Sequence, residues 1–408
     1  MLLAQTGCTA ESDGGQQSVN QAPASEALAE PTLTTTTAAS TVASTSTATS
    51  AADSTETSSA VEDAAPVAVV LRLGGIDDAF VESLLAVDGL NWVSLVERGQ
   101  VHLKASSDAA GNAVDAPPDG FVIQLEAVAH GQVGSVERYA PELVEALGSL
   151  GERELILSRS SAELRRLDVG STITFDNQAS FDVAAIVEDS VVGTSEVVFG
   201  GSEALSAAGG GSSSRQLAFV GYDGTGSQLE GQLLQADGGS GIRVFGGRDN
   251  GERDRQRTTL SAIEVKKIFG EFAFRPIGGS AIEIDPAWTE ANLVTADLPL
   301  LGPARCHRVF AEILIDVLQS LIDDGLEDVI DPGAFQGCWN PRRIAGSSRV
   351  SKHSWGMAAD INFGNSLEGG PGSPVHPELL KRMLAADVIS GHLWTASPDP
   401  GHFEYRGP

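Results

Sequence analysis

Two stretches near the C-terminus, Ser351-Lys-His-Ser-Trp-Gly-Met-Ala-Ala-Asp360 and Asp399-Pro-Gly-His-Phe-Glu404, supply two imidazoles and a carboxylate as candidate metal ligands. Zn²⁺ accepts His nitrogen and Asp oxygen readily, and three protein ligands leave a fourth position for water. A further carboxylate, Asp399, lies three residues before the second His and can serve as the base that takes a proton from that water. The pattern indicates metal-assisted hydrolysis.

The spacing of the first stretch constrains its local structure. His353 and Asp360 are seven residues apart, which on a helix is too far for both side chains to reach one ion. A bend at Gly356 lets them converge if the segment is extended. The run 358–363 is typical of a buried strand, from which Asp360 projects inward.

The second stretch is expected to form part of a hairpin. Residues 392–395 and 402–405 have the pattern of two short strands, and the Ala-Ser-Pro-Asp-Pro-Gly segment between them is a strong turn signal. Because side chains alternate along a strand, His402 and Glu404 should share one face. Asp399 should lie on the turn beside His402.

Together these motifs resemble the VanY-type zinc peptidases, which comprise D-alanyl-D-alanine carboxypeptidases and L-alanyl-D-glutamate endopeptidases. The similarity extends upstream through segments that have the order found in the endopeptidase-like branch, so it covers roughly Ile263 to Pro408. Those segments are Phe269-Gly-Glu-Phe, Trp288, Leu298-Pro-Leu-Leu-Gly302, Cys306-His-Arg308 and Trp339-Asn-Pro-Arg-Arg-Ile344.

The resemblance implies a role for each matching position. His353, Asp360 and His402 match the zinc ligands, and Asp399 matches the general base and acid. Arg342 matches the arginine that binds the substrate carbonyl or carboxylate and stabilises the oxyanion.

Two further positions belong to the same comparison. Ser351 matches the serine before the first ligand, and Arg343 is a second candidate for the arginine role because the pair is adjacent. Many members of the family have Glu where this chain has Asp399, and Asp at this position favours the endopeptidase-like branch. Taken singly, each of these side chains has an ordinary alternative as a surface or turn residue.

The composition excludes some classes of partner. The 408-residue chain has 55 acidic and 26 basic residues and a formal net charge of −29. Binding to nucleic acid requires a basic surface, and so does electrostatic attachment to anionic lipid. Neither partner is expected, and the composition suits an extracellular protein.

The chain has three cysteines. Cys306 and Cys338 both fall in the C-terminal region, where a disulfide is the favoured interpretation in an exported protein and two buried thiols are the alternative. Cys8 ends the stretch Leu2-Leu-Ala-Gln-Thr-Gly-Cys8, which resembles the end of a truncated lipoprotein signal in residues 1–8. An unmodified Cys in a disordered tail is the alternative.

Composition shifts divide the rest of the chain. Residues 9–64 are rich in Ser, Thr and Ala and are expected to be a disordered linker. Residues 66–245 should form a separate α+β domain, with a strand from Val67, a helix from Asp77 to Val87, and paired strands at 92–96 and 100–104. The Gly/Ser-rich residues 200–214 are expected to be a flexible loop.

The boundary between the two domains is also visible in the sequence. Residues 246–262 are expected to be a linker or long loop before the C-terminal domain, residues 263–408. In that domain, apolar residues recur at helical spacing over 309–322 and predict an amphipathic helix. The expected fold class is α+β, with a C-terminal zinc peptidase domain built on a small antiparallel sheet and flanking helices.

The stretch 154–189 is similar to the extracytoplasmic domain of ABC-type permeases of the macrolide-exporter kind. This resemblance implies contact with an envelope protein partner, and a spacer is the equally plausible alternative. No catalytic constellation is evident between residues 66 and 245.

The sequence thus predicts a zinc-dependent peptidase that hydrolyses peptidoglycan stem peptides. It is expected in the cell envelope, outside the cytoplasmic membrane. A lipid on Cys8 would anchor it to the outer face of that membrane. The alternative is an inactive zinc-containing module that binds the cell wall or a partner. The presence of Asp399 argues against that alternative, because a pure binder has no need of a base there.

Overall fold

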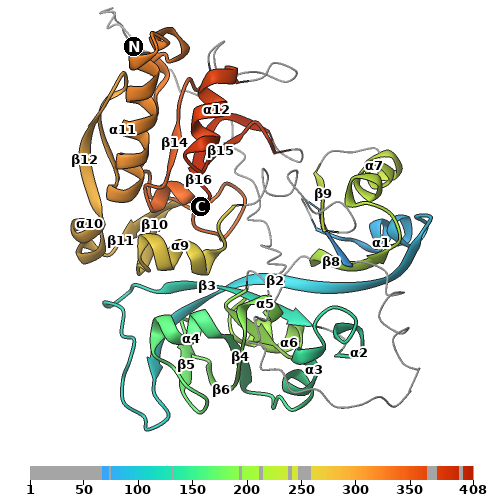
Figure 1. The fold of residues 1–408 in the computed structure, drawn as a ribbon. Helices are drawn as coiled ribbons and strands as arrows, with labels where there is room; N and C mark the ends of the chain where they lie inside the picture. Colours follow the sequence, from blue (N-terminus) through green and yellow to red (C-terminus); the bar gives the residue numbers. More distant parts are fainter. Residues whose placement is uncertain are drawn as a thin grey trace, which may run out of the picture.

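The computed structural model describes residues 67–72, 75–130, 133–192, 195–210, 215–237, 241–246, 259–364, 375–394 and 398–407. They form a middle domain (residues 67–246) and a C-terminal domain (residues 259–407), both built of helices and strands (Figure 1). The α+β fold class expected from the sequence is confirmed. The expectations for residues 1–8, for Cys8, for residues 9–64 and for most of the 246–262 linker lie outside the described residues.

The middle domain is built on one nine-stranded sheet with the order β3-β7-β4-β6-β5-β2-β8-β1-β9. Strand β2 also pairs with β3, so part of the sheet forms a closed ring of hydrogen-bonded strands, in the order β2, β5, β6, β4, β7 and β3. The strands are β1 (Val67–Arg72), β2 (Leu90–Ser107), β3 (Ile123–His130), β4 (Glu154–Ser158), β5 (Thr172–Phe175), β6 (Ser180–Val187), β7 (Val197–Phe199), β8 (Arg215–Tyr222) and β9 (Ile242–Gly246).

Short helices cover this sheet. They are α1 (Asp78–Leu85), α2 (Val133–Val136), α3 (Pro141–Gly148), α4 (Arg159–Arg165), α5 (Asp189–Val192), α6 (Ser202–Ala207) and α7 (Gly226–Asp237). Helix α1 is capped by Asp77, whose carboxylate accepts a hydrogen bond from the Phe80 amide, as expected for a helix start. The predicted strand at Val67 and helix from Asp77 are both present.

Two local expectations for the middle domain are wrong. The strands expected at 92–96 and 100–104 are one strand, β2, because the backbone from Val96 to Leu103 is paired continuously with β3. This pairing overrides the weak strand propensity of Gly99. In the segment expected to be a loop, residues 202–207 form α6, with Leu205 buried against the sheet.

The C-terminal domain surrounds a three-stranded antiparallel sheet of order β14-β16-β15. Two hairpins, β10-β11 and β12-β13, complete its strands. The elements are α9 (Ala262–Phe269), β10 (Phe274–Gly278), β11 (Ala281–Ile284), α10 (Pro286–Asn292), β12 (Leu293–Leu298), β13 (Gly302–His307), α11 (Arg308–Asp323), β14 (Ala358–Asp360), α12 (Pro377–Ala385), β15 (Val388–Gly391) and β16 (Asp399–Tyr405), with 3₁₀ turns η1 (Glu327–Val329), η2 (Pro332–Ala334) and η3 (Lys352–Ser354).

Helix α11 is the amphipathic helix predicted over 309–322. Its buried side chains recur every three to four residues and belong to the core of the C-terminal domain. They are Phe310, Ala311, Leu314, Val317, Leu318 and Leu321. The prediction from apolar periodicity is confirmed.

The hairpin expected near the C-terminus has a different first strand. The strand that pairs with β16 is Val388–Gly391, and residues 392–394 form a turn. A side chain at Gly391 would lie 2.3 Å from the carbonyl oxygen of Asp399, so the chain approaches itself closely there and the strand ends. Asp399 is the first residue of β16 rather than part of a free turn.

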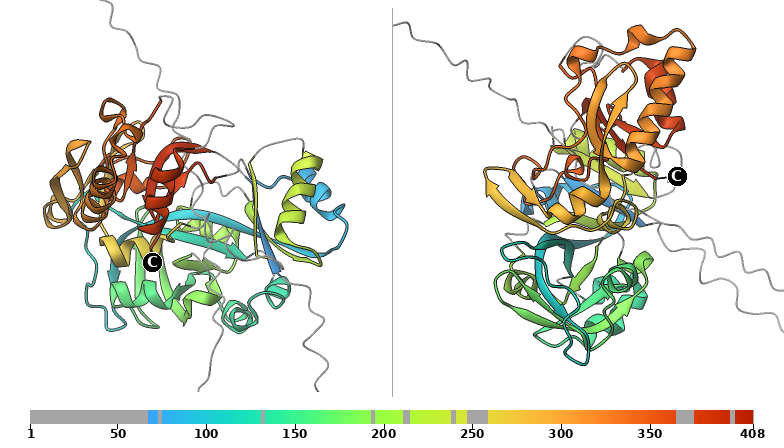
Figure 2. Two further views of the ribbon diagram at one scale, coloured as in Figure 1. Left: turned by 45° about the horizontal axis from the view of Figure 1, so that its top comes forward. Right: turned by 90° about the vertical axis from the view of Figure 1, so that its left-hand side faces the viewer.

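The two domains are packed together in the structure (Figure 2). Helix α9 lies against α4 of the middle domain, and Val122 next to β3 pairs with Phe274 of β10. Among the described helices, none has the length and apolar character needed to cross a bilayer.

Candidate metal centre

The first candidate ligand, His353, lies on the 3₁₀ turn η3. Ser351 caps this turn by accepting a hydrogen bond from the His353 amide at 3.2 Å. The turn ends at Gly356, which has φ +68° and would place a Cβ 2.7 Å from the backbone nitrogen of His307. Only glycine fits there, so the bend expected at Gly356 is required by the packing of η3 against the end of β13.

The other two candidate ligands face each other across the sheet. In the antiparallel pairing of β14 with β16, Asp360 lies directly opposite His402 and Ala359 opposite Phe403. Side chains alternate along each strand, so Asp360 and His402 share one face while Ala359 and Phe403 are buried in the core. The strand register therefore brings together residues 42 positions apart.

Three donor atoms converge at this point. His353 Nε2, His402 Nδ1 and Asp360 Oδ1 are each 3.2 Å from the other two. In a tetrahedral zinc site with bonds of about 2.0–2.1 Å, ligand atoms lie about 3.3 Å apart. The three donors therefore fit one face of such a site, and these are the residues predicted from the sequence.

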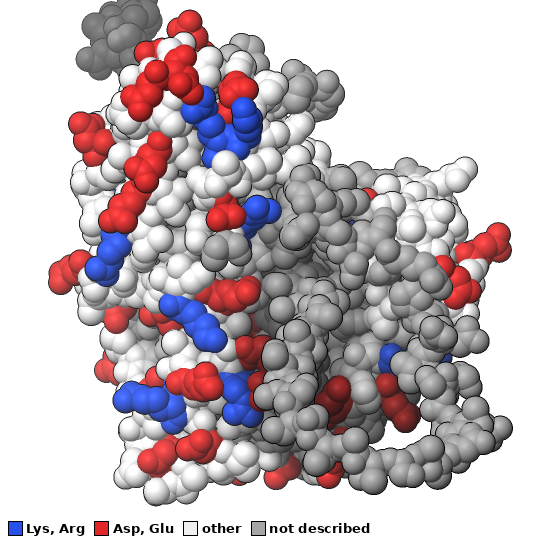
Figure 3. Space-filling model, in the orientation of Figure 1, with Lys and Arg blue, Asp and Glu red and all other residues white. Residues whose placement is uncertain are grey.

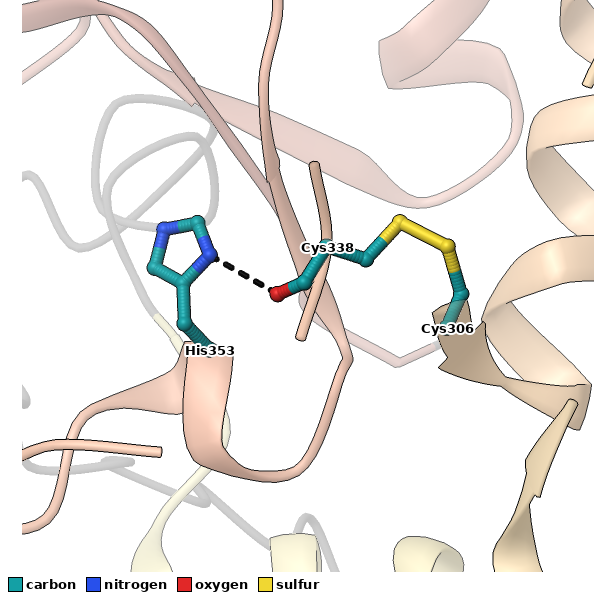
Figure 4. Close-up of a disulfide and its surroundings, with 3 residues drawn as sticks. All are labelled: Cys306, Cys338 and His353. Atoms are coloured by element: carbon teal, nitrogen blue, oxygen red, sulfur yellow. Dashed lines mark hydrogen bonds between the residues drawn. A yellow bond between two sulfur atoms is a disulfide. The ribbon is translucent and has the colours of Figure 1, made fainter. Parts of the chain in front are cut away.

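The orientation of His353 is set by a backbone carbonyl. Its Nδ1 donates a hydrogen bond of 2.9 Å to the carbonyl oxygen of Cys338 (Figure 4). This leaves Nε2 facing the other candidate ligands. Cys338 forms a disulfide with Cys306 on β13, across a Cα–Cα distance of 5.1 Å. This bond ties the carbonyl that orients His353 to a strand of the domain core.

The segment around Cys338 also supports the second ligand. Gly337 forms a bridge with Asp360, and the Asp360 carbonyl accepts a hydrogen bond from the Gln336 amide. The Asn340 amide donates to the carbonyl of His353 at 3.0 Å. Residues 336–340 therefore hold both the η3 turn and strand β14 in place.

The charges of the site favour a cation among its ligands. Burial opposes ionisation of Asp360, but hydrogen bonds with His353 and His402 hold the pKa of Asp360 well below its ordinary value. Burial likewise lowers the pKa of His402, yet hydrogen bonds with Asp360 and Glu404 raise it well above its ordinary value. A positive charge at this position, carried by a proton or a metal ion, offsets the buried carboxylates.

The two adjacent arginines, Arg342 and Arg343, make different contacts. The Arg342 guanidinium donates to Ser351 Oγ at 3.2 Å, next to the η3 turn. The Arg343 guanidinium instead donates to the carbonyl of Gly279 at 2.8 Å, in the turn between β10 and β11. Of the two, Arg342 is the one whose side chain contacts the η3 segment.

Asp399 is buried at the start of β16. A regular strand would place residues 399 and 402 on opposite faces, but the pairing with β15 shifts register in this region: Ser390 pairs with Phe403 and Gly391 with Asp399. The irregular backbone over Pro400 and Gly401 breaks the alternation. A role for Asp399 beside the ligands therefore remains compatible with the strand geometry.

The decisive comparison is with known families. Residues 345–405, which contain all three ligands and Asp399, match a family model described as D-alanyl-D-alanine carboxypeptidase. This segment is similar to that family. The family resemblance predicted from the motifs is thereby confirmed. A comparison with curated proteins found no match.

Solved structures similar to the chain include two transporter domains. One is the periplasmic region of MacB from Actinobacillus actinomycetemcomitans, with 14% identity, a TM-score of 0.30, and coverage of 48% of this chain and 94% of that one. The other is the extracellular domain of the noncanonic ABC-type transporter YknZ from Gram-positive bacteria, with 13% identity, a TM-score of 0.27, and coverage of 44% and 99%.

The segment 345–405 contains one further polar residue that the sequence motifs left without a role. Glu404 is buried, and its carboxylate accepts a hydrogen bond of 3.1 Å from His402 Nε2, so that Nδ1 faces the other ligands. Burial raises the pKa of Glu404, but the nearby Lys352 and His402 lower it below its ordinary value. A carboxylate behind a metal-binding histidine fixes the ring and strengthens it as a ligand. The signal in the sequence was its position two residues after His402 on one strand face.

His307 and His376, outside the motif, serve the scaffold of the C-terminal domain. His307 accepts a hydrogen bond from the Val309 amide at the start of α11, and His376 accepts one from Glu378 at the start of α12. Burial lowers the pKa of His307 to about 4. Both are helix caps.

Acidic side chains are spread over both domains on the face shown in Figure 3, interspersed with basic ones.

Proposed function

We propose that this protein is a zinc-dependent peptidase that hydrolyses peptidoglycan stem peptides, of the D-Ala-D-Ala carboxypeptidase or L-Ala-D-Glu endopeptidase type. The observation that carries the proposal is the convergence of His353 Nε2, Asp360 Oδ1 and His402 Nδ1 within a segment that matches a carboxypeptidase family. Their nitrogen and oxygen donors suit Zn²⁺.

When bound, Zn²⁺ would polarise the scissile carbonyl and activate water at neutral pH. The chain's own residues would do the rest. Asp399 would accept the proton from the attacking water and deliver it to the leaving amine. Arg342, held by Ser351, would bind the substrate carbonyl or carboxylate and stabilise the developing negative charge.

The setting in the cell follows from the substrate. Peptidoglycan lies outside the cytoplasmic membrane, so we propose an extracellular location in the cell envelope, with attachment through a lipid on Cys8. A disulfide between Cys306 and Cys338 accords with an oxidising compartment. The middle domain is proposed to contact an envelope protein.

The test is to incubate the full chain with muropeptides and to follow the products by mass spectrometry, with and without a chelator. Loss of a terminal D-alanine would identify a carboxypeptidase, and cleavage between L-Ala and D-Glu an endopeptidase. Chelation should abolish cleavage, and adding Zn²⁺ back should restore it.

The control is the His402→Ala variant, prepared and loaded in the same way. It should lack stoichiometric zinc and activity. If the wild-type chain holds one zinc ion, binds muropeptides and cleaves none of them, the proposal of a peptidase is wrong and the protein is a zinc-containing binding module.

A further inference from the structure

One face of the middle-domain sheet is polar and is turned toward the C-terminal domain. On the adjacent strands β2 and β3, the apolar residues Val101, Leu103 and Leu125 alternate with polar ones and belong to the middle-domain core. The polar residues are Arg98, Gln100, His102, Gln124 and Glu126, and three of them, Arg98, Gln124 and Glu126, are buried. Such burial of polar side chains requires partners.

A charge cluster is also buried between the domains. Glu196 of the middle domain accepts hydrogen bonds from Lys266 Nζ at 2.9 Å and from Arg165 at 2.8 Å. Lys266 belongs to α9 and also pairs with Glu271 at 3.1 Å, which in turn pairs with Arg165. Two cations and two carboxylates balance, and the side chains of Arg165 and Glu196 are fully buried. The domains are therefore docked through an interior-like contact.

A hairpin of the C-terminal domain reaches the same polar face. Its two arms, at residues 342–344 and 349–351, are joined by the bridge between Arg343 and Val350 and by the hydrogen bond from the Ser351 amide to the Arg342 carbonyl. We call residues 342–351 the arginine hairpin. One arm carries Arg342, and the other leads directly into η3 and His353.

The tip of the arginine hairpin is held by the middle domain. Arg349 Nε donates to Glu126 Oε1 at 3.4 Å, and Ser348 Oγ donates to Gln100 Oε1 at 2.5 Å. Gln100 also donates to the second oxygen of Glu126 at 3.0 Å. The pairs Arg349–Glu126 and Ser348–Gln100 thus join positions more than 220 residues apart in the sequence.

Glu126 connects this contact to the buried charge cluster. Its backbone amide donates to Glu196 Oε2 at 3.0 Å, and the Glu196 amide donates back to the Glu126 carbonyl at 2.8 Å. Burial, followed by the charge of Arg349, lowers the pKa of Arg98 to about 10, and the charge of Glu126 opposes this shift. Removing the charge of Glu126 would leave Arg98 and Arg349 to repel each other.

We propose that the middle domain is a positioning element of the active site: Glu126 and Gln100 hold the arginine hairpin through Arg349 and Ser348, so that Arg342 is presented to the substrate. This rests on the proposed peptidase function. The middle domain then affects substrate binding through a series of contacts. Glu196 bonds to Glu126, and Glu126 bonds to Arg349 of the arginine hairpin. In the same hairpin, Arg342 bonds to Ser351, which bonds to the amide of His353.

The first test compares kinetics of the full-length Glu126→Gln and Arg349→Gln variants with the wild type. Release of the hairpin should lower kcat/KM by about 10- to 100-fold, mainly through a higher KM, because Arg342 would no longer be held for the substrate. Zinc content should stay at one ion per chain. A loss of folded protein would instead lower kcat per chain and leave KM unchanged. The Glu145→Gln variant, on the exposed side of α3, is the matched control and should behave as wild type.

The Arg349→Gln change leaves Glu126 with its hydrogen bonds from Gln100 and Gln124, so it is the variant expected to preserve folding. The double variant should lose no more activity than the more affected single variant, because both changes remove the same contact. Additive losses would overturn the proposal.

The second test does not depend on peptidase activity. Limited trypsin digestion should cut the arginine hairpin after Arg343 faster in both variants than in the wild type and in Glu145→Gln. If the variants are cut faster but the wild-type chain has no peptidase activity, the proposed function is wrong and the hairpin contact is supported. An active wild-type chain whose variants keep their KM and their protease resistance would refute the positioning role.

Discussion

At the scale of single residues, each histidine of the metal centre uses one ring nitrogen for the protein and offers the other to the site. His353 donates to the carbonyl of Cys338, and His402 donates to the carboxylate of Glu404. Ligand orientation is therefore set before a metal binds, which reduces the cost of assembling the site. We expect mutation to separate the residues proposed to hold the metal from the residue proposed to move the proton.

Replacing Asp399 by Asn should abolish proton transfer without removing the metal. Activity should fall by about 10²- to 10⁴-fold, the usual contribution of a general base. Zinc content, measured by elemental mass spectrometry, should remain one ion per chain. An Asp399→Asn variant that keeps near wild-type cleavage would show that the base is another residue.

Replacing Glu404 by Gln should weaken the metal centre by removing the charge behind His402. We expect zinc affinity to fall by about 10- to 100-fold, as is usual for a carboxylate that supports a ligating histidine. Competition with a fluorescent chelator measures the change. The control is Glu290→Gln on the exposed side of α10, and equal affinities of the two variants would contradict the role of Glu404.

At the scale of elements, the metal centre depends on a segment without regular structure. Residues 336–340 hydrogen-bond with both the η3 turn and strand β14, and the disulfide attaches this segment to β13. The three candidate ligands lie on three separate elements, η3, β14 and β16, and residues 336–340 join the first two, so this segment determines how well His353 and Asp360 stay aligned.

Removing the disulfide should destabilise the domain and loosen the site. The bond joins positions 32 residues apart, and closing a loop of that length restricts the unfolded chain by roughly 3–4 kcal/mol. The Cys306→Ser/Cys338→Ser double variant should lose about that much unfolding free energy in urea, with weaker zinc binding. A loss below about 1 kcal/mol with unchanged zinc affinity would show that residues 336–340 are held by other contacts.

At the scale of the whole molecule, the two domains contact each other through buried charged side chains. In this cluster, the side chains of Arg165, Glu196, Lys266 and Glu271 pair with one another in place of the water that they would otherwise bind. Removing one partner leaves an uncompensated buried charge, which typically costs about 3–5 kcal/mol. The C-terminal domain expressed alone would expose Lys266 and lose the support of its arginine hairpin.

This cluster predicts how stability depends on pH. Burial opposes the charge of Glu196, but Lys266 and Arg165 hold its pKa below the ordinary value. Because the pKa of Glu196 is lower in the folded than in the unfolded protein, its carboxylate stabilises the fold at pH values above the unfolded-state pKa of about 4.3. This stabilisation is lost as the pH falls through the folded-state pKa. Stability should therefore decrease on acidification below about pH 4.5.

The measurement is the urea unfolding free energy between pH 7 and pH 3. The Glu196→Gln variant should be less stable at pH 7 and should show a smaller decrease toward pH 3, because it has no carboxylate to protonate at that position. Parallel curves for the variant and the wild type would contradict the assignment of this pH dependence to Glu196.

The ligand set, the capped helix α1 and the amphipathic helix α11 could be predicted from the sequence, because each depends on residue type and short spacing. The length of β2 and the first strand of the C-terminal hairpin could not be predicted. Both depend on contacts between residues that are not adjacent in the sequence. Strand β3 pairs with β2 on both sides of Gly99, a residue of weak strand propensity, and β15 ends where Gly391 lies close to Asp399.

The sequence by itself determined the candidate metal ligands, since His353, Asp360 and His402 are recognisable by type and order and lie 3.2 Å from one another in the structure. Only the tertiary structure decided what covers the polar face of β2 and β3. Alternating polar and apolar residues look the same whether the polar face meets water or a second domain. The contact of Glu126 with Arg349 spans 223 positions, and no local pattern encodes a pairing at that separation.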